Sequence, residues 1–156
     1  MGLQVVVITD IRYLSKSDKP HYAYMNVEWL YSADEICLTA TEGFYEYAMR
    51  MNVINNIAHF YFNQHLESLA LLIGWRSVNQ IRYHPRKYGI PFVDLMYTNC
   101  FDGSFDWLSC SRLAYEFETW YDVALKINNA EFVEWYDQMM SAFKYAAENN
   151  GAVLYL

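Results

Sequence analysis

The architecture of the chain is clearest at its C-terminal end, CFDGSFDWLSCSRLAYEFETWYDVALKINNAEFVEWYDQMMSAFKYAAENNGAVLYL (Cys100–Leu156). Two segments repeat apolar residues at helical spacing, and each follows a polar residue suited to an N-cap. These caps are Ser104 for the first segment and Asn128, with Glu131 at capping-box spacing, for the second. The predicted buried stripes are Cys110, Leu113, Ala114, Phe117, Tyr121 and Ala124 in the first helix, and Phe132, Val133, Tyr136, Met139, Met140, Phe143 and Ala147 in the second.

The remaining elements are predicted from shorter patterns. The apolar segment at 152–156 indicates a terminal strand, and β-branched or alternating residues indicate strands at Leu3–Ile8, within 21–31 and at Phe92–Tyr97. Apolar spacing from about Phe62 to the stop at Gly74 predicts a helix. Because the turn between the two C-terminal helices is short, we expect them to form an antiparallel hairpin against a sheet.

These elements together predict an α+β fold. The expected core is a small mixed or antiparallel sheet packed by about three helices, including the C-terminal helix hairpin. The polar segment 12–20 is expected to be a loop, and 32–60 fits either helix or strand. A chain of 156 residues suits one globular domain, 1–156, with a core large enough to fold without disulfides.

Aromatic residues dominate the composition, with 15 Tyr, 9 Phe and 5 Trp in a chain that is 54% apolar. Such a composition excludes intrinsic disorder and predicts a core filled with rings. Tyr also combines rigid apolar area with a polar tip, which protein interfaces favour. The tyrosines are therefore expected at the edge of the core, at a partner interface, or at both.

The cellular setting is predicted from what the sequence lacks. No apolar run reaches the roughly 18 residues of a membrane span, and MGLQVVVITD does not have the pattern of a signal peptide. Cys37, Cys100 and Cys110 are odd in number and form no Cys-x-x-Cys pair, which fits reduced thiols rather than a zinc site. We therefore expect a cytoplasmic protein without membrane contact.

The net charge of -7 is unevenly distributed. Acidic residues concentrate in 101–156, whereas the segment between Glu67 and Asp94 has no acid and carries basic residues instead. The acidic balance disfavours nucleic acid as a partner, because phosphates would be repelled. A protein partner with a basic surface is expected.

Acid pairs on the C-terminal helices are the first candidate site. Glu118 with Asp122, and Glu134 with Asp137, have helical spacings that bring carboxylates together, which suits cation binding or acid–base chemistry. A solvated helix face is the simpler interpretation. His59 and His65 are six residues apart and do not match the spacing of a zinc site, so neither a metal nor a cofactor is predicted.

The basic segment 76–88 is the second candidate. Arg82, Arg86 and Lys87 are suited to clamp the phosphate of a phosphorylated or nucleotide ligand, with Tyr83 stacking on a base. Pairing of these basic side chains with the acidic helices inside the fold is the favoured interpretation. No phosphate-binding glycine loop accompanies them.

The loop 98–103 lies between a predicted strand and a helix N-terminus, where main-chain amides can lower the pKa of a thiol such as that of Cys100. No His is placed by the sequence to act as its base, so a structural loop is favoured. With FVDLMY before it and GAVLYL at the chain end, the loop resembles that of a family of uncharacterised bacterial and phage proteins with a Ser-Asp-Cys-Glu-Gly loop.

The resemblance covers 91–156. Thr98, Asn99, Cys100 and Gly103 align with the family's Ser, Asp, Cys and Gly, while Phe101 and Asp102 replace its Glu. It implies a bacterial or bacteriophage origin, hence a bacterial host cell, and transfers no activity.

The leading hypothesis is a non-catalytic acidic binding protein of phage or mobile-element origin. It would engage and inhibit a host protein with a basic surface, in the manner of an anti-defence (anti-CRISPR) inhibitor of a nuclease. The predicted contact residues are the acids Glu118, Asp122, Glu131, Glu134 and Asp137 and the aromatic anchors Trp120, Trp135 and Tyr145. The alternatives are an enzyme or sensor that uses the basic segment, and a structural protein that self-associates, for example as a homodimer.

Overall fold

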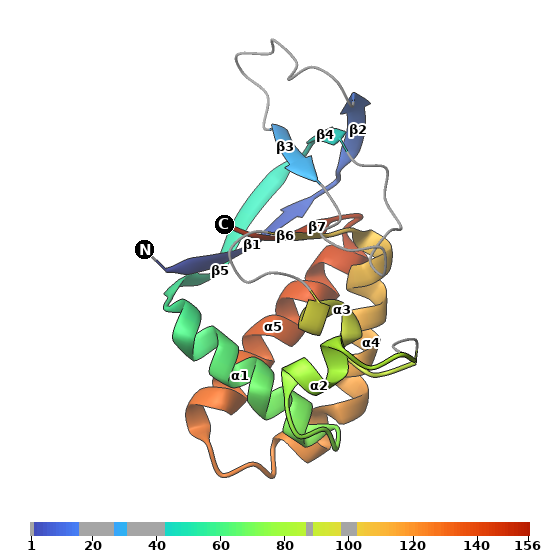
Figure 1. The fold of residues 1–156 in the computed structure, drawn as a ribbon. Helices are drawn as coiled ribbons and strands as arrows, with labels where there is room; N and C mark the ends of the chain where they lie inside the picture. Colours follow the sequence, from blue (N-terminus) through green and yellow to red (C-terminus); the bar gives the residue numbers. More distant parts are fainter. Residues whose placement is uncertain (1, 16–26, 31–42, 87–88, 98–102) are drawn as a thin grey trace.

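The computed structural model describes residues 2–15, 27–30, 43–86, 89–97 and 103–156. The fold is α+β, with two antiparallel sheets above a layer of helices (Figure 1). The strands are β1 (Leu3–Thr9), β2 (Arg12–Ser15), β3 (Val27–Leu30), β4 (Gly43–Glu46), β5 (Met49–Ile57), β6 (Gly103–Phe105) and β7 (Ala152–Tyr155). The helices are α1 (His59–Leu72), α2 (Val78–Arg82), α3 (Val93–Tyr97), α4 (Trp107–Ala124) and α5 (Ala130–Glu148).

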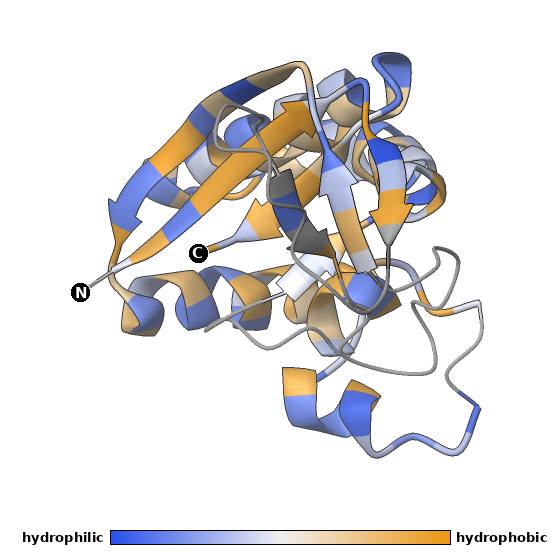
Figure 2. Cartoon of the chain, turned by 90° about the horizontal axis from the view of Figure 1, so that it is seen from above, coloured by the Kyte–Doolittle hydropathy of each residue, from blue (hydrophilic) through white to orange (hydrophobic). Residues whose placement is uncertain are grey.

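The larger sheet has the strand order β5-β1-β7-β6, with every neighbouring pair antiparallel. Its central strands β1 and β7 are buried on both faces, and Figure 2 shows them as mainly hydrophobic. This explains why their sequences are nearly continuous apolar runs rather than alternating ones. The strands predicted at both chain ends are confirmed, and they lie side by side, with the Leu156 N–H donating to the Gln4 carbonyl at 3.0 Å.

The smaller sheet, in the order β2-β4-β3, covers the face of the larger sheet that the helices leave open. Val6 and Ile8 of β1 point to this side and form a second apolar cluster with Leu30 and Tyr45. The strand predicted within 21–31 is confirmed for Val27–Leu30. The loop predicted at 12–20 is wrong for Arg12–Ser15, because this segment pairs with β4.

The hairpin of α4 and α5 is confirmed and supplies most of the main core. Phe117 is at its centre, with ring centroids 4.8 Å from Tyr136 and 5.9 Å from Phe143. The Tyr136 hydroxyl donates to the Phe117 carbonyl at 2.7 Å, so this buried tyrosine keeps a hydrogen-bond partner. The predicted dominance of aromatic packing is therefore confirmed.

The helix starts differ from the predicted ones by one or two residues. Asp106, not Ser104, caps α4 by accepting the Ser109 N–H, because Ser104 is paired within β6. Asn129, not Asn128, caps α5 by accepting the Phe132 N–H. In both cases a neighbouring residue of the same capping class takes the role.

The buried stripes of α4 and α5 are also shifted from the predicted ones. Tyr121 in α4, and Val133, Met140 and Ala147 in α5, are only half-buried. Trp135, Ala142 and Ala146 complete the buried face of α5 in their place. The buried face of α5 is therefore rotated relative to the predicted one.

The strand predicted at Phe92–Tyr97 is wrong, because Val93–Tyr97 is the short helix α3. Phe92 adopts a positive φ of 60° and buries its ring 4.8 Å from that of Phe117. Its N–H donates to a Glu116 carboxylate oxygen at 2.8 Å. These tertiary contacts override the β propensity of the segment.

The helix predicted from about Phe62 is confirmed as α1, and Gly74 just after it adopts a φ of 91°. Position 151, between α5 and β7, requires glycine, because a Cβ there would lie 2.3 Å from the Ile8 carbonyl oxygen. Among the described helices, none is both long and apolar enough to cross a membrane.

Candidate functional site

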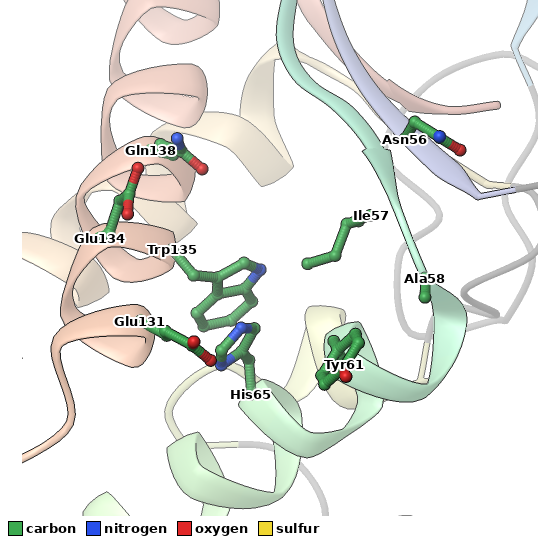
Figure 3. Close-up of a pocket in the computed structure, with 9 residues that line it drawn as sticks. All are labelled: Asn56, Ile57, Ala58, Tyr61, His65, Glu131, Glu134, Trp135 and Gln138. Carbon is green, nitrogen blue, oxygen red and sulfur yellow. The ribbon is translucent and has the colours of Figure 1, made fainter.

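A groove of about 490 Å³ opens where the end of β5, the first turns of α1 and the N-terminal half of α5 meet (Figure 3). Its size is in the range of sites that hold small ligands or single side chains of a partner. Polar, acidic, aromatic and aliphatic side chains line it: Asn56, Ile57, Ala58, Tyr61, His65, Glu131, Glu134, Trp135 and Gln138.

Local structure explains how these residues meet. Asn56 has a φ of 59°, a conformation that Asn tolerates, and it lies at an irregularity in the pairing of β5 with β1, just before β5 ends at Ile57 and α1 begins at His59. Tyr61 and His65 are one helical turn apart and so share a face of α1. Glu131, Glu134 and Gln138 have spacings of three and four on α5, which form one face in the same way.

The floor of the groove is a stacked pair of rings. His65 and Trp135 have centroids 5.2 Å apart and ring planes 22° from parallel. Burial lowers the pKa of His65, and the nearby charge of Glu131 opposes this shift. Burial therefore favours the neutral form of His65, which adds no positive charge to the groove.

Two exposed carboxylates form the α5 wall. Glu131 and Glu134 form no ion pair with any residue that the structure describes. No Lys or Arg is among the lining residues of the groove. The groove is therefore a concave, acidic surface with an aromatic floor.

Trp135 brings an unpaired donor to this site. The side chain is only 2% exposed, and its Nε1 is buried with no hydrogen-bond acceptor within the described parts of the chain. The indole nitrogen points toward the space between α5 and Ile57 (Figure 3). The expectation that Trp135 lies at the surface is wrong, because its ring packs on His65 and at 5.7 Å from Phe62.

The other predicted contact residues do not form one surface with this groove. Glu118 is 2.6 Å from Lys144 in an exposed ion pair, and the nearby negative charge of Asp137 raises the pKa of the Tyr121 hydroxyl. Asp122 is exposed on α4. Trp120 and Tyr145, predicted as surface anchors, are half-buried against the main core.

The basic segment is only partly open. Arg82 donates from Nε to the Met96 carbonyl at 2.5 Å, and its own carbonyl accepts the Tyr97 hydroxyl. The predicted pairing of this segment with the acidic helices is therefore wrong for Arg82, whose guanidinium bonds a main-chain carbonyl. Arg86 and Tyr83 are exposed, and Lys87 is outside the described residues.

The described residues give little support for a reactive cysteine or a metal site. Cys110 is fully buried, its thiol lies 3.4 Å from the Phe105 carbonyl, and burial raises its pKa, which disfavours the thiolate. The loop prediction for Cys100 falls on residues outside the described ranges. No group of three metal-binding side chains occurs in residues 2–15, 27–30, 43–86, 89–97 or 103–156.

Sequence reasoning did not identify Tyr61 or Gln138, and it considered His65 only as a metal ligand. The spacing of four between Tyr61 and His65 was a usable signal, because it places both on one side of the predicted helix. Their meeting with α5 depends on how α1 packs, which no local pattern encodes.

Comparisons with known proteins add no assignment. No protein-family model matches the sequence, and neither the curated proteins nor the solved structures contain a match to this chain. The resemblance carried by the loop 98–103 stays a prediction.

Proposed function

We propose that this chain is a non-catalytic binding protein whose acidic groove receives a Lys or Arg side chain of a basic protein partner. The observation that carries the proposal is that two carboxylates, Glu131 and Glu134, form no ion pair with the described residues and lie beside an aromatic floor. Carboxylates at the mouth of a concave site attract a cation. This electrostatic attraction becomes stronger as water is displaced from between the charges.

The aromatic floor suits the same ligand. A guanidinium or ammonium group is stabilised beside aromatic rings, by about 0.5–1 kcal/mol at an exposed site and more when desolvated. Tyr61 is an exposed ring at the rim, and Ile57 offers an apolar wall for the methylene stem of Arg or Lys. Charge and shape therefore favour the same class of side chain.

The sequence-based hypothesis of a host defence nuclease as the target fits within this proposal. A nuclease holds its nucleic acid on a surface rich in Arg and Lys, which is the chemistry that the groove requires. Phage origin and the inhibition of such an enzyme remain predictions from the sequence.

The test is binding of defined basic peptides to the purified full chain. An array of acetylated, amidated octapeptides with Arg or Lys at alternate positions supplies the probes, and calorimetry at low salt measures the affinity of the best one. The double variant Glu131→Gln/Glu134→Gln should weaken binding at least tenfold, since each lost charge contact is worth about 1 kcal/mol.

A matched control separates the groove from net charge. Asp122→Asn/Glu148→Gln removes the same two charges from exposed positions outside the groove and should change affinity less than twofold. Equal weakening by both variants, or no binding by any peptide of the array, would refute the proposal.

A further inference from the structure

Strand β5 is an edge of the larger sheet. It is the longest strand described, with nine residues from Met49 to Ile57, and among the described strands only β1 pairs with it. Its outer main-chain groups therefore face no described strand. The opposite edge, β6, has only three residues, so β5 is the better template for another strand.

The side chains of β5 give this edge little protection. Met49 and Met51 are 49% and 39% exposed, and the strand contains no Lys and no Pro, the residues that commonly block an edge. Arg50 is its one cation, and it is engaged by Glu28 of β3 at 3.1 Å.

The acidic groove begins where this edge ends. Asn56 and Ile57 belong to β5 and also line the groove, and α5 brings Glu131 and Glu134 to the helix side of the same sheet (Figures 1 and 3). In an added strand every second side chain would point to this helix side, with about 6.6 Å between successive ones. A peptide lying along β5 could thus deliver a basic side chain into the groove.

Trp135 adds an independent constraint on the ligand. Its buried Nε1–H needs an acceptor, and the ammonium of Lys and the guanidinium of Arg have none. A main-chain carbonyl next to the basic residue would supply one. A peptide therefore satisfies the groove better than a simple amine, which carries only the cation.

We infer that the basic partner binds as an extended segment that adds a strand to the outer edge of β5, which no described strand covers, and places an Arg or Lys between Glu131 and Glu134. This inference rests on the proposed function, whose cation site it uses. Charge complementarity selects a basic segment over a second copy of this chain, because the net charge of -7 would be set against itself.

The test uses main-chain methylation of the best octapeptide from the array. One version is N-methylated at odd positions and another at even positions, so both keep every side chain and charge. Successive N–H groups of a strand point to opposite edges, so only one version should lose binding, by at least tenfold. Peptide binding should also slow amide hydrogen exchange in 49–57.

Each outcome has a separate meaning. If both methylated peptides bind like the parent and exchange in 49–57 is unchanged, strand addition is refuted while the cation site stands. If the parent peptide itself fails to bind, the proposed function is refuted as well. A dimer of this chain through β5, seen as concentration-dependent sedimentation, would replace the basic partner by a second copy.

Discussion

Two acidic regions of the molecule differ in how their charges are neutralised. At the contact of α3 with α4, Asp94 is 1% exposed and bonds Arg112 at 2.6 Å, and Glu116 accepts the Phe92 N–H. At the groove, Glu131 and Glu134 are exposed and pair with no described cation. The first region uses its carboxylates to hold the fold, and the second leaves them available to a ligand.

The basic segment extends this comparison. Arg82 is engaged inside the fold, whereas Arg86 in the same basic segment is exposed. The charged residues therefore form two classes: those that bond a partner inside the fold, such as Arg82, and those that are exposed, such as Arg86. Variants of the first class should change stability, and variants of the groove should change binding alone.

The largest expected effect is at the buried pair. Arg112→Met leaves the Asp94 carboxylate without its cation and should lower the free energy of unfolding by about 3 kcal/mol, because a buried charge that loses its partner is costly. Urea denaturation measures this. The groove variant Glu131→Gln/Glu134→Gln should stay within about 0.5 kcal/mol of the wild type. Equal losses in both would remove the distinction between the two regions.

A smaller effect is expected at Arg82. Arg82→Met removes the donor to the Met96 carbonyl and should destabilise the protein by about 1–2 kcal/mol. Arg86→Met is the matched control and should shift the unfolding midpoint little, since that side chain is exposed. If Arg86→Met were the more destabilising of the two, Arg82 would not hold the structural role assigned to it.

The smallest effect depends on pH. Burial raises the pKa of Glu116 from its ordinary value of 4.5 to about 7. The folded protein then holds a proton that the unfolded chain releases, so this contribution to stability is full below pH 4.5 and is lost as pH rises through about 7. Glu116→Gln should therefore match the wild type near pH 4.5 and exceed it by about 1 kcal/mol at pH 8, after allowance for partial exposure.

The control for this pH profile is Glu118→Gln. Glu118 is on the same helix in an exposed pair with Lys144, and its removal should leave the difference from the wild type nearly flat across the same range. Denaturation midpoints measured at pH 4.5, 6 and 8 suffice. If the difference for Glu116→Gln were also flat across this range, the pKa of the Glu116 carboxyl would not be raised in the folded state.

Some features of the candidate site were predictable and others were not. Glu131 and Glu134 were identified because helical spacing places acids on the outer face of α5. Trp135 was named as a contact residue but expected at the surface, since periodicity fixes the relative positions of residues on a helix and not the rotation of that helix against α1. The groove itself joins residues from β5, α1 and α5, far apart in the sequence.

By itself, the sequence determined the elements with long or continuous patterns: β1, β7, α1 and the hairpin of α4 and α5. Their apolar spacing is a property of the local sequence, so it can be recognised without knowing which other segments pack against them. Tertiary structure decided the helical state of Val93–Tyr97, the internal use of Arg82 and the position of Trp135 beside Glu131 and Glu134. Each depends on contacts between segments far apart in the sequence. The energies of these contacts outweigh the local secondary-structure preference, and the contacts produce no periodic pattern in the sequence.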